Sequence, residues 1–118
     1  MKKFISIIII LLGYLPLMAQ NDYYIKQAQS YQREAEYYTK QALGYERDVD
    51  YYNRQAQDYL REAEYYSKRQ NYDRGKTYLQ RAKKATDKAE GYSRKAKNAR
   101  ECAMDYMRKA EYALKRAK

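Results

Sequence analysis

Carboxylates recur in pairs along the first half of the chain, where they are the residues best suited to acid–base chemistry. The pairs are Glu34/Glu36, Asp48/Asp50 and Glu62/Glu64. Two residues apart on a helix, the side chains of such a pair point in different directions, so they cannot share a proton or a metal ion. The chain also has no histidine and no glycine-rich phosphate loop. We therefore expect no catalytic residue, metal site, cofactor or small-molecule substrate, and we interpret the acids as surface ion-pair partners.

Cys102 is the only cysteine. An unpaired cysteine in an exported protein can form a disulfide between two copies of the chain. A tolerated free thiol is the equally open alternative, and gel migration with and without a reductant distinguishes the two.

A further set of residues could bind a partner rather than react. Four tyrosines recur every fourteen residues, at Tyr23, Tyr37, Tyr51 and Tyr65. Regularly spaced exposed rings are suited to anchor a protein interface. The sharper interpretation is a second contact face for another copy or a partner protein. The plainer one is that the rings lie over the stems of neighbouring Arg and Gln side chains.

Positive charge is concentrated in the second half of the chain. Residues 72–118 carry 15 basic and 6 acidic side chains, whereas residues 20–71 carry 8 and 9. The bases that the expected fold leaves free are Lys83, Lys84, Arg94, Lys97, Arg108, Lys115 and Lys118. Such a surface suits acidic polymers, namely nucleic acid, acidic polysaccharide or anionic lipid headgroups. A solvated face is the alternative.

A fourteen-residue repeat positions all these side chains. Tyrosine and alanine alternate at spacings of four and three from Tyr24 to Tyr66, with a single valine, and the spacing resumes from Tyr78 to Ala117. This is the heptad pattern of a coiled coil. The interval between Tyr66 and Tyr78 is two residues short of a double heptad and contains Asn71 and Gly75, which favours a turn there.

We predict an all-α fold, a long antiparallel two-helix hairpin with a helix at 23–69, a turn at 70–72 and a helix at 72–118. Within the seam, tyrosines should face alanines of the other helix, as Tyr59 faces Ala82, so that no layer stacks tyrosine on tyrosine. A tyrosine–alanine seam without leucine should be only marginally stable on its own. We therefore expect self-association, to a homodimer that forms a four-helix bundle.

Flanking charges support the same register. It places three acids of the first helix, Glu34, Asp48 and Glu62, opposite three bases of the second, Lys109, Lys95 and Arg81. Each exposed ion pair contributes only about 0.2–1 kcal/mol, so these pairs select the register rather than hold the fold together.

Residues 1–19 have the pattern of a cleaved signal peptide. Lys2 and Lys3 precede an apolar stretch from Phe4 to Leu12, and Leu17-Met18-Ala19 forms a cleavage site. The alternative, an uncleaved membrane anchor, is disfavoured because the apolar run is short. We expect a hairpin domain over 20–118, exported to the periplasm or the extracellular space.

Tyr59, Ala63, Tyr66, Gly75, Leu79 and Ala82 follow one another at a spacing that resembles a single tetratricopeptide helix-turn-helix, and KRQNYDRGKTYLQRA reads like the turn of that family. The resemblance covers residues 59–82. Glu62 stands where the family has leucine, Asp87 stands where it has its closing proline, and no second 34-residue unit follows. The resemblance implies a helical turn and, because the family typically binds peptides and proteins, a protein ligand.

The function that we expect is an exported, non-enzymatic coiled-coil scaffold that acts through protein contacts. A polyanion-binding or cell-envelope-binding protein is the first alternative. The second is a periplasmic holdase, because a small basic exported hairpin resembles the arms of Skp-type chaperones, although the β body with which those proteins trimerise is absent.

Overall fold

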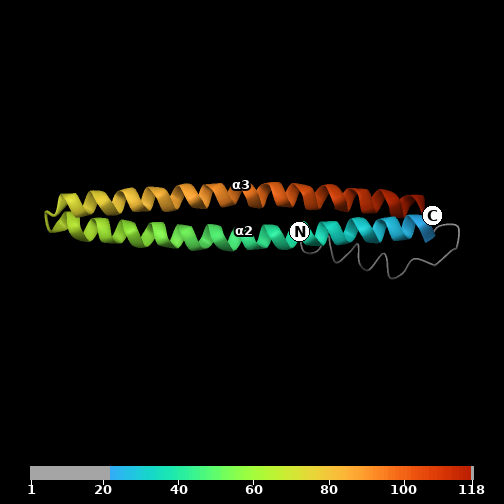
Figure 1. Cartoon of the computed structure of the whole chain (residues 1–118), viewed down its shortest axis with the longest axis horizontal. Coiled ribbons are helices and arrows are strands. Elements are labelled where there is room, and N and C mark those ends of the chain that lie inside the picture. The colour runs from blue at the N-terminus through green and yellow to red at the C-terminus, as the bar shows by residue number, and fades with distance from the viewer. Residues whose placement is uncertain (1–21, 118) are drawn as a thin grey trace. The chain divides into compact units, whose positions relative to one another are not determined.

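The computed structural model describes residues 22–117, all but a few of which are helical. Helix α2 spans Asp22–Lys68 and helix α3 spans Tyr72–Arg116 (Figure 1). The predicted all-α fold with two long helices is therefore confirmed. Helix α3 is continuous through Gly91. The signal peptide expected at 1–19 lies outside the described residues.

The chain divides into two compact units, and both contain a piece of each helix. Among the described residues, one unit comprises 22–41 and 98–117, and the other is Ala42–Lys97, which includes the turn. Ring contacts between α2 and α3 occur within each unit, and they pair residues in antiparallel order. Each unit is thus a short stretch of antiparallel helix pair.

A tight turn at residues 69–71 separates the helices. The Asn71 amide donates to the Tyr66 carbonyl at 2.9 Å, and the Gln70 amide donates to the Ser67 carbonyl at 3.0 Å. This pair of bonds is the Schellman motif that commonly ends helices. Gln70 has a φ of 61°, a left-handed conformation that costs a residue with a Cβ roughly 1–2 kcal/mol. Asn71 then caps α3, because its side-chain oxygen accepts from the Arg74 amide at 3.4 Å.

Gly75 lies where the two helices come close beside this turn. A Cβ added at Gly75 would lie 2.8 Å from the Ser67 hydroxyl and 3.4 Å from the Ala63 carbonyl oxygen, both on α2. Added at Gly44 or Gly91 it would meet nothing within 4 Å. Gly75 therefore serves a close approach of the helices, which explains its place beside the turn.

Small residues form the core of both units. Every alanine at a seam position in the described residues is at most 7% exposed, whereas the seam tyrosines are half-buried. The large buried aliphatic residues are Ile25 and Leu114. The alanine methyl groups therefore allow the two helix backbones to come close together. The tyrosine rings lie at the sides of the interface between the helices rather than at its centre.

One expectation about the seam is wrong, because tyrosine does contact tyrosine between the helices. Tyr92 of α3 lies between two rings of α2, with centroids 6.1 Å from Tyr45 and 5.6 Å from Tyr52. The same arrangement recurs around Tyr78 and Tyr106, at centroid distances of 5.5–6.2 Å. A phenol ring is long enough to reach the layers on either side of its own, and each of the three α3 seam tyrosines is therefore flanked by two α2 rings. We call the surroundings of Tyr78, Tyr92 and Tyr106 the closed layers.

Candidate functional site

The bases beside the seam lie over tyrosine rings. Lys109 Nζ is 4.9 Å from the Tyr106 centroid and 5.9 Å from that of Tyr31. Lys95 covers Tyr92 and Tyr45 in the same way, at 5.1 and 5.9 Å. The ion pairs found inside the two units instead join residues three or four apart on one helix. The expectation that Lys109 and Lys95 act mainly as carboxylate partners is thus corrected, because the half-buried rings offer a nearer negative face.

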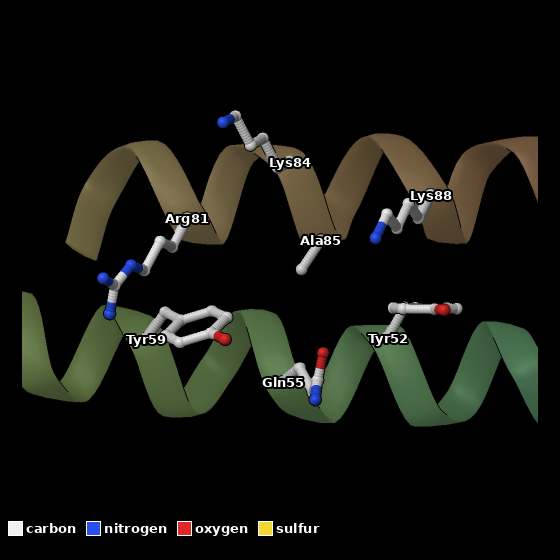
Figure 2. A pocket seen from close by; sticks show the side chains of 7 residues that line it. All are labelled: Tyr52, Gln55, Tyr59, Arg81, Lys84, Ala85 and Lys88. Carbon is white, nitrogen blue, oxygen red and sulfur yellow. The ribbon is translucent and has the colours of Figure 1, made fainter. Parts of the chain in front are cut away.

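The seam is open at two positions where α3 carries alanine in place of tyrosine, Ala85 and Ala113. Between Tyr52 and Tyr59, α3 presents Ala85, and a cavity of about 170 Å³ lies there. Its other lining residues are Gln55, Arg81, Lys84 and Lys88. Figure 2 shows Arg81 and Lys88 extending toward α2 on either side of Ala85, whereas the Lys84 amine points away from α2. We call this cavity the Ala85 notch.

A second notch with the same pattern lies in the other unit. It is about 480 Å³ and is lined by Gln27, Tyr31, Arg108, Lys109, Tyr112, Ala113 and Arg116. Tyr59, Gln55, Arg81, Ala85 and Lys88 of the first notch correspond to Tyr31, Gln27, Lys109, Ala113 and Arg116 here, each shifted by 28 residues. We call it the Ala113 notch.

Both notches are cationic. Each is lined by three bases and by no acidic residue. In the Ala113 notch the Arg116 guanidinium donates to the Tyr112 hydroxyl at 3.0 Å. That hydrogen bond raises the pKa of Arg116 above its ordinary value. The positive charge of Arg116 therefore persists across the physiological pH range.

The tyrosine row predicted from the sequence, Tyr23, Tyr37, Tyr51 and Tyr65, is exposed on α2. Its members are 48–67% exposed, and each packs edge-on against the seam tyrosine that follows it, at 5.1–5.2 Å between centroids. The Gln41 amide donates to the Tyr37 hydroxyl and the Gln55 amide to the Tyr51 hydroxyl, both at 2.8 Å. These contacts fix the rings in place while their outer faces stay in solvent. Arg69 covers Tyr65 at 3.7 Å, so the plainer interpretation also holds for one ring.

Of the seven bases predicted to be free for polyanion binding, the six on α3 are all exposed, and Lys118 lies outside the described residues. Lys84 lines the Ala85 notch and Arg108 lines the Ala113 notch, so these two lie beside a cavity. Arg108 also pairs with Asp105 at 3.3 Å. Lys83, Arg94, Lys97 and Lys115 line neither notch. The structure thus gathers cations at two places rather than along one continuous stripe.

Cys102 is an exposed free thiol in the same unit as Tyr38. Burial raises the pKa of the Tyr38 phenol, and nearby Tyr106, Cys102 and Glu34 raise it further. Tyr38 stacks on Tyr106 at 5.8 Å with 9° between the ring planes, which is the source of that burial. Cys102 therefore lies near the closed layer around Tyr106. An interchain disulfide and a tolerated free thiol both stay open as interpretations.

The paired acids remain on the surface. Glu64 pairs with Lys68 at 3.1 Å, and Glu36 accepts from Gln32 at 3.3 Å. Within residues 22–117 no three potential metal ligands gather at one place. Neither α2 nor α3 contains an apolar stretch of the length and hydropathy that a bilayer-crossing helix requires.

The notches are the part of the surface that sequence reasoning missed. Their signal is present in the sequence. Every seventh residue of the first-half seam, from Tyr24 to Tyr66, is tyrosine, whereas every seventh residue from Tyr78 to Ala113 is alternately tyrosine and alanine. Recognising a cavity in that alternation requires the knowledge that rings from neighbouring layers touch.

No protein-family model, no curated protein and no solved structure matches this chain. Residues 59–82 form a helix-turn-helix with Gly75 at the close approach of the two helices.

Proposed function

We propose that this chain is an exported, non-enzymatic scaffold that acts through protein–protein contacts and assembles with copies of itself. The observation that carries the proposal is the tyrosine row. Four rings recur every fourteen residues on one helix, and each is fixed by its neighbouring ring while 48–67% of its surface faces solvent. Aromatic side chains that are held in place before binding lose little conformational entropy on forming an interface.

The half-buried seam supports self-assembly. The core of each unit consists of alanine methyl groups and partly exposed rings, and the large buried aliphatic residues, Ile25 and Leu114, belong to one unit only. Association with a second copy would bury more of this apolar surface, at about 25 cal/mol per Å². Export follows from the signal-peptide pattern of residues 1–19.

The test replaces the four tyrosines of the row with serine in the purified chain. The matched control replaces Tyr72 and Leu79, which are exposed on α3 outside the row and line neither notch. The row variant should keep its helical circular dichroism and lose self-association by light scattering, while the control keeps both. A row variant that associates like the wild type contradicts the proposal, and one that loses helicity shows that the row belongs to the core.

Polyanion binding is a second candidate, favoured by the cation-only lining of both notches. Binding of this kind weakens steeply as salt is raised, because counterions are released. Filter binding to nucleic acid and to an acidic polysaccharide that shows no such salt dependence would exclude it.

A further inference from the structure

The Ala85 notch is open where the neighbouring closed layer holds a phenol ring. In the neighbouring closed layer, the space between Tyr45 and Tyr52 is filled by the Tyr92 ring at 6.1 and 5.6 Å. The space between Tyr52 and Tyr59 has the same α2 frame, but α3 contributes only the methyl group of Ala85. A ring supplied from outside the chain could therefore take the place that Tyr92 takes one layer away.

The rim of the notch adds a charge requirement. Arg81 and Lys88 reach toward α2 on the two sides of Ala85 (Figure 2), and the lining contains no carboxylate to balance them. An entering ring should therefore carry a negative charge close beside it. In the Ala113 notch Lys109 and Arg116 take the corresponding positions, so a ring that enters it should also carry a negative charge close beside it.

The chain itself displays such a group four times. Every tyrosine of the row directly follows an acid, in the dipeptides Asp22-Tyr23, Glu36-Tyr37, Asp50-Tyr51 and Glu64-Tyr65. The four rings are 48–67% exposed. The ion pairs of Asp22 with Lys26 and of Glu64 with Lys68 are solvent-exposed, so exchanging them for a partner's cation costs little.

We propose that the Ala85 and Ala113 notches are binding sites for the acid–tyrosine dipeptides of a second copy of this chain. In the Ala85 notch the ring enters between Tyr52 and Tyr59 above the alanine, and in the Ala113 notch it enters beside Tyr31. In both, the adjacent carboxylate meets the bases at the rim. This inference rests on the proposed self-assembly and assigns its two surfaces. Because dipeptide and notch are different surfaces, one chain can bind partner copies through both.

The test fills the notches from within. Replacing Ala85 and Ala113 with tyrosine should reproduce the packing of Tyr92 and leave the fold intact. The dissociation constant for self-association should rise at least about tenfold, because the anchor ring loses its pocket. The matched control is Thr86→Tyr, which places a ring on the exposed side of α3 and should associate like the wild type.

A mixing experiment makes the assignment specific. The notch-filled chain retains its dipeptides, and the row variant with serine at the four tyrosines retains its notches. Each alone should remain unassociated, and the two mixed should form a complex in light scattering. Unchanged association of the notch-filled chain, or no complex on mixing, would overturn the inference.

The outcomes also separate this inference from the proposed function. If the row variant loses association while the notch-filled chain keeps it, the scaffold function stands and the notch assignment fails. If filling the notches removes binding to an acidic polysaccharide but leaves association unchanged, the notches are polyanion sites instead. A wild type that is monomeric at every concentration tested overturns both proposals.

Discussion

The closed layer around Tyr92 and the Ala85 notch lie in the same unit and share a ring, Tyr52. On the α2 side the two are alike, since each is bounded by two seam tyrosines. On the α3 side one has a phenol ring and the other a methyl group. The difference therefore lies in the α3 residue. Tyr92 fills its layer with a ring of the same chain, and Ala85 leaves its layer open to solvent.

The largest effect should come from opening a closed layer. Tyr92→Ala removes the ring between Tyr45 and Tyr52, and the half-buried site cannot collapse onto so small a residue. We expect a loss of about 2–3 kcal/mol in the free energy of unfolding, measured by urea titration with circular dichroism. Tyr72→Ala, at a 66% exposed position, should change it by less than about 0.5 kcal/mol. Equal losses in both variants would mean that the closed layer adds nothing.

Closing the open layer should have a smaller effect of opposite sign. Ala85→Tyr places a ring into the notch and should raise the free energy of unfolding by about 1–2 kcal/mol. Ala82→Tyr, three residues earlier at a buried position that lines no notch, should lower it by about 1–3 kcal/mol through overpacking. Thermal melts of the two variants check the difference in sign, and a destabilised Ala85→Tyr chain would show that the notch is not ring-sized.

Removing a cation from a closed layer should matter less. Lys109→Gln keeps much of the stem but deletes the charge 4.9 Å from Tyr106 and 5.9 Å from Tyr31. We expect a loss of about 0.5–1 kcal/mol. Lys115→Gln, exposed on the same helix, is the control and should be neutral. If the two substitutions cost the same, the positions of the bases over the rings have no energetic role.

The smallest effect concerns pH. The pKa of Tyr38 is raised above 10.0 in the folded chain, chiefly by burial. Folding thus favours the neutral phenol, so this contribution to stability is complete below about pH 10 and is lost as the pH rises through the folded-state pKa. Tyr38→Phe should show a shallower alkaline decline of the melting temperature than the wild type. An unchanged decline would show that Tyr38 does not contribute to it.

The two long helices and the turn between them could be predicted from the sequence, because their signals can be read along the chain. These signals are the heptad spacing and an interval from Tyr66 to Tyr78 that is two residues short of a double heptad. The turn followed from Asn71 and Gly75, although nothing in the sequence signals that Gln70, rather than a glycine, adopts the left-handed conformation. The ring contacts of Tyr92 and the cation over Tyr106 could not be predicted by pairing residues layer by layer. Side chains as long as tyrosine and lysine reach past the layer in which their backbone lies.

The tight turn also constrains how this chain can evolve. The turn at residues 69–71 sets which residues of α2 pair with which residues of α3. An insertion or deletion in one helix alone would therefore shift every ring beyond it relative to the other helix. Length can change without that damage only when both arms gain or lose the same multiple of the repeat. Homologues, if they vary in size, should therefore differ in steps of about 28 residues in total, and never by a few.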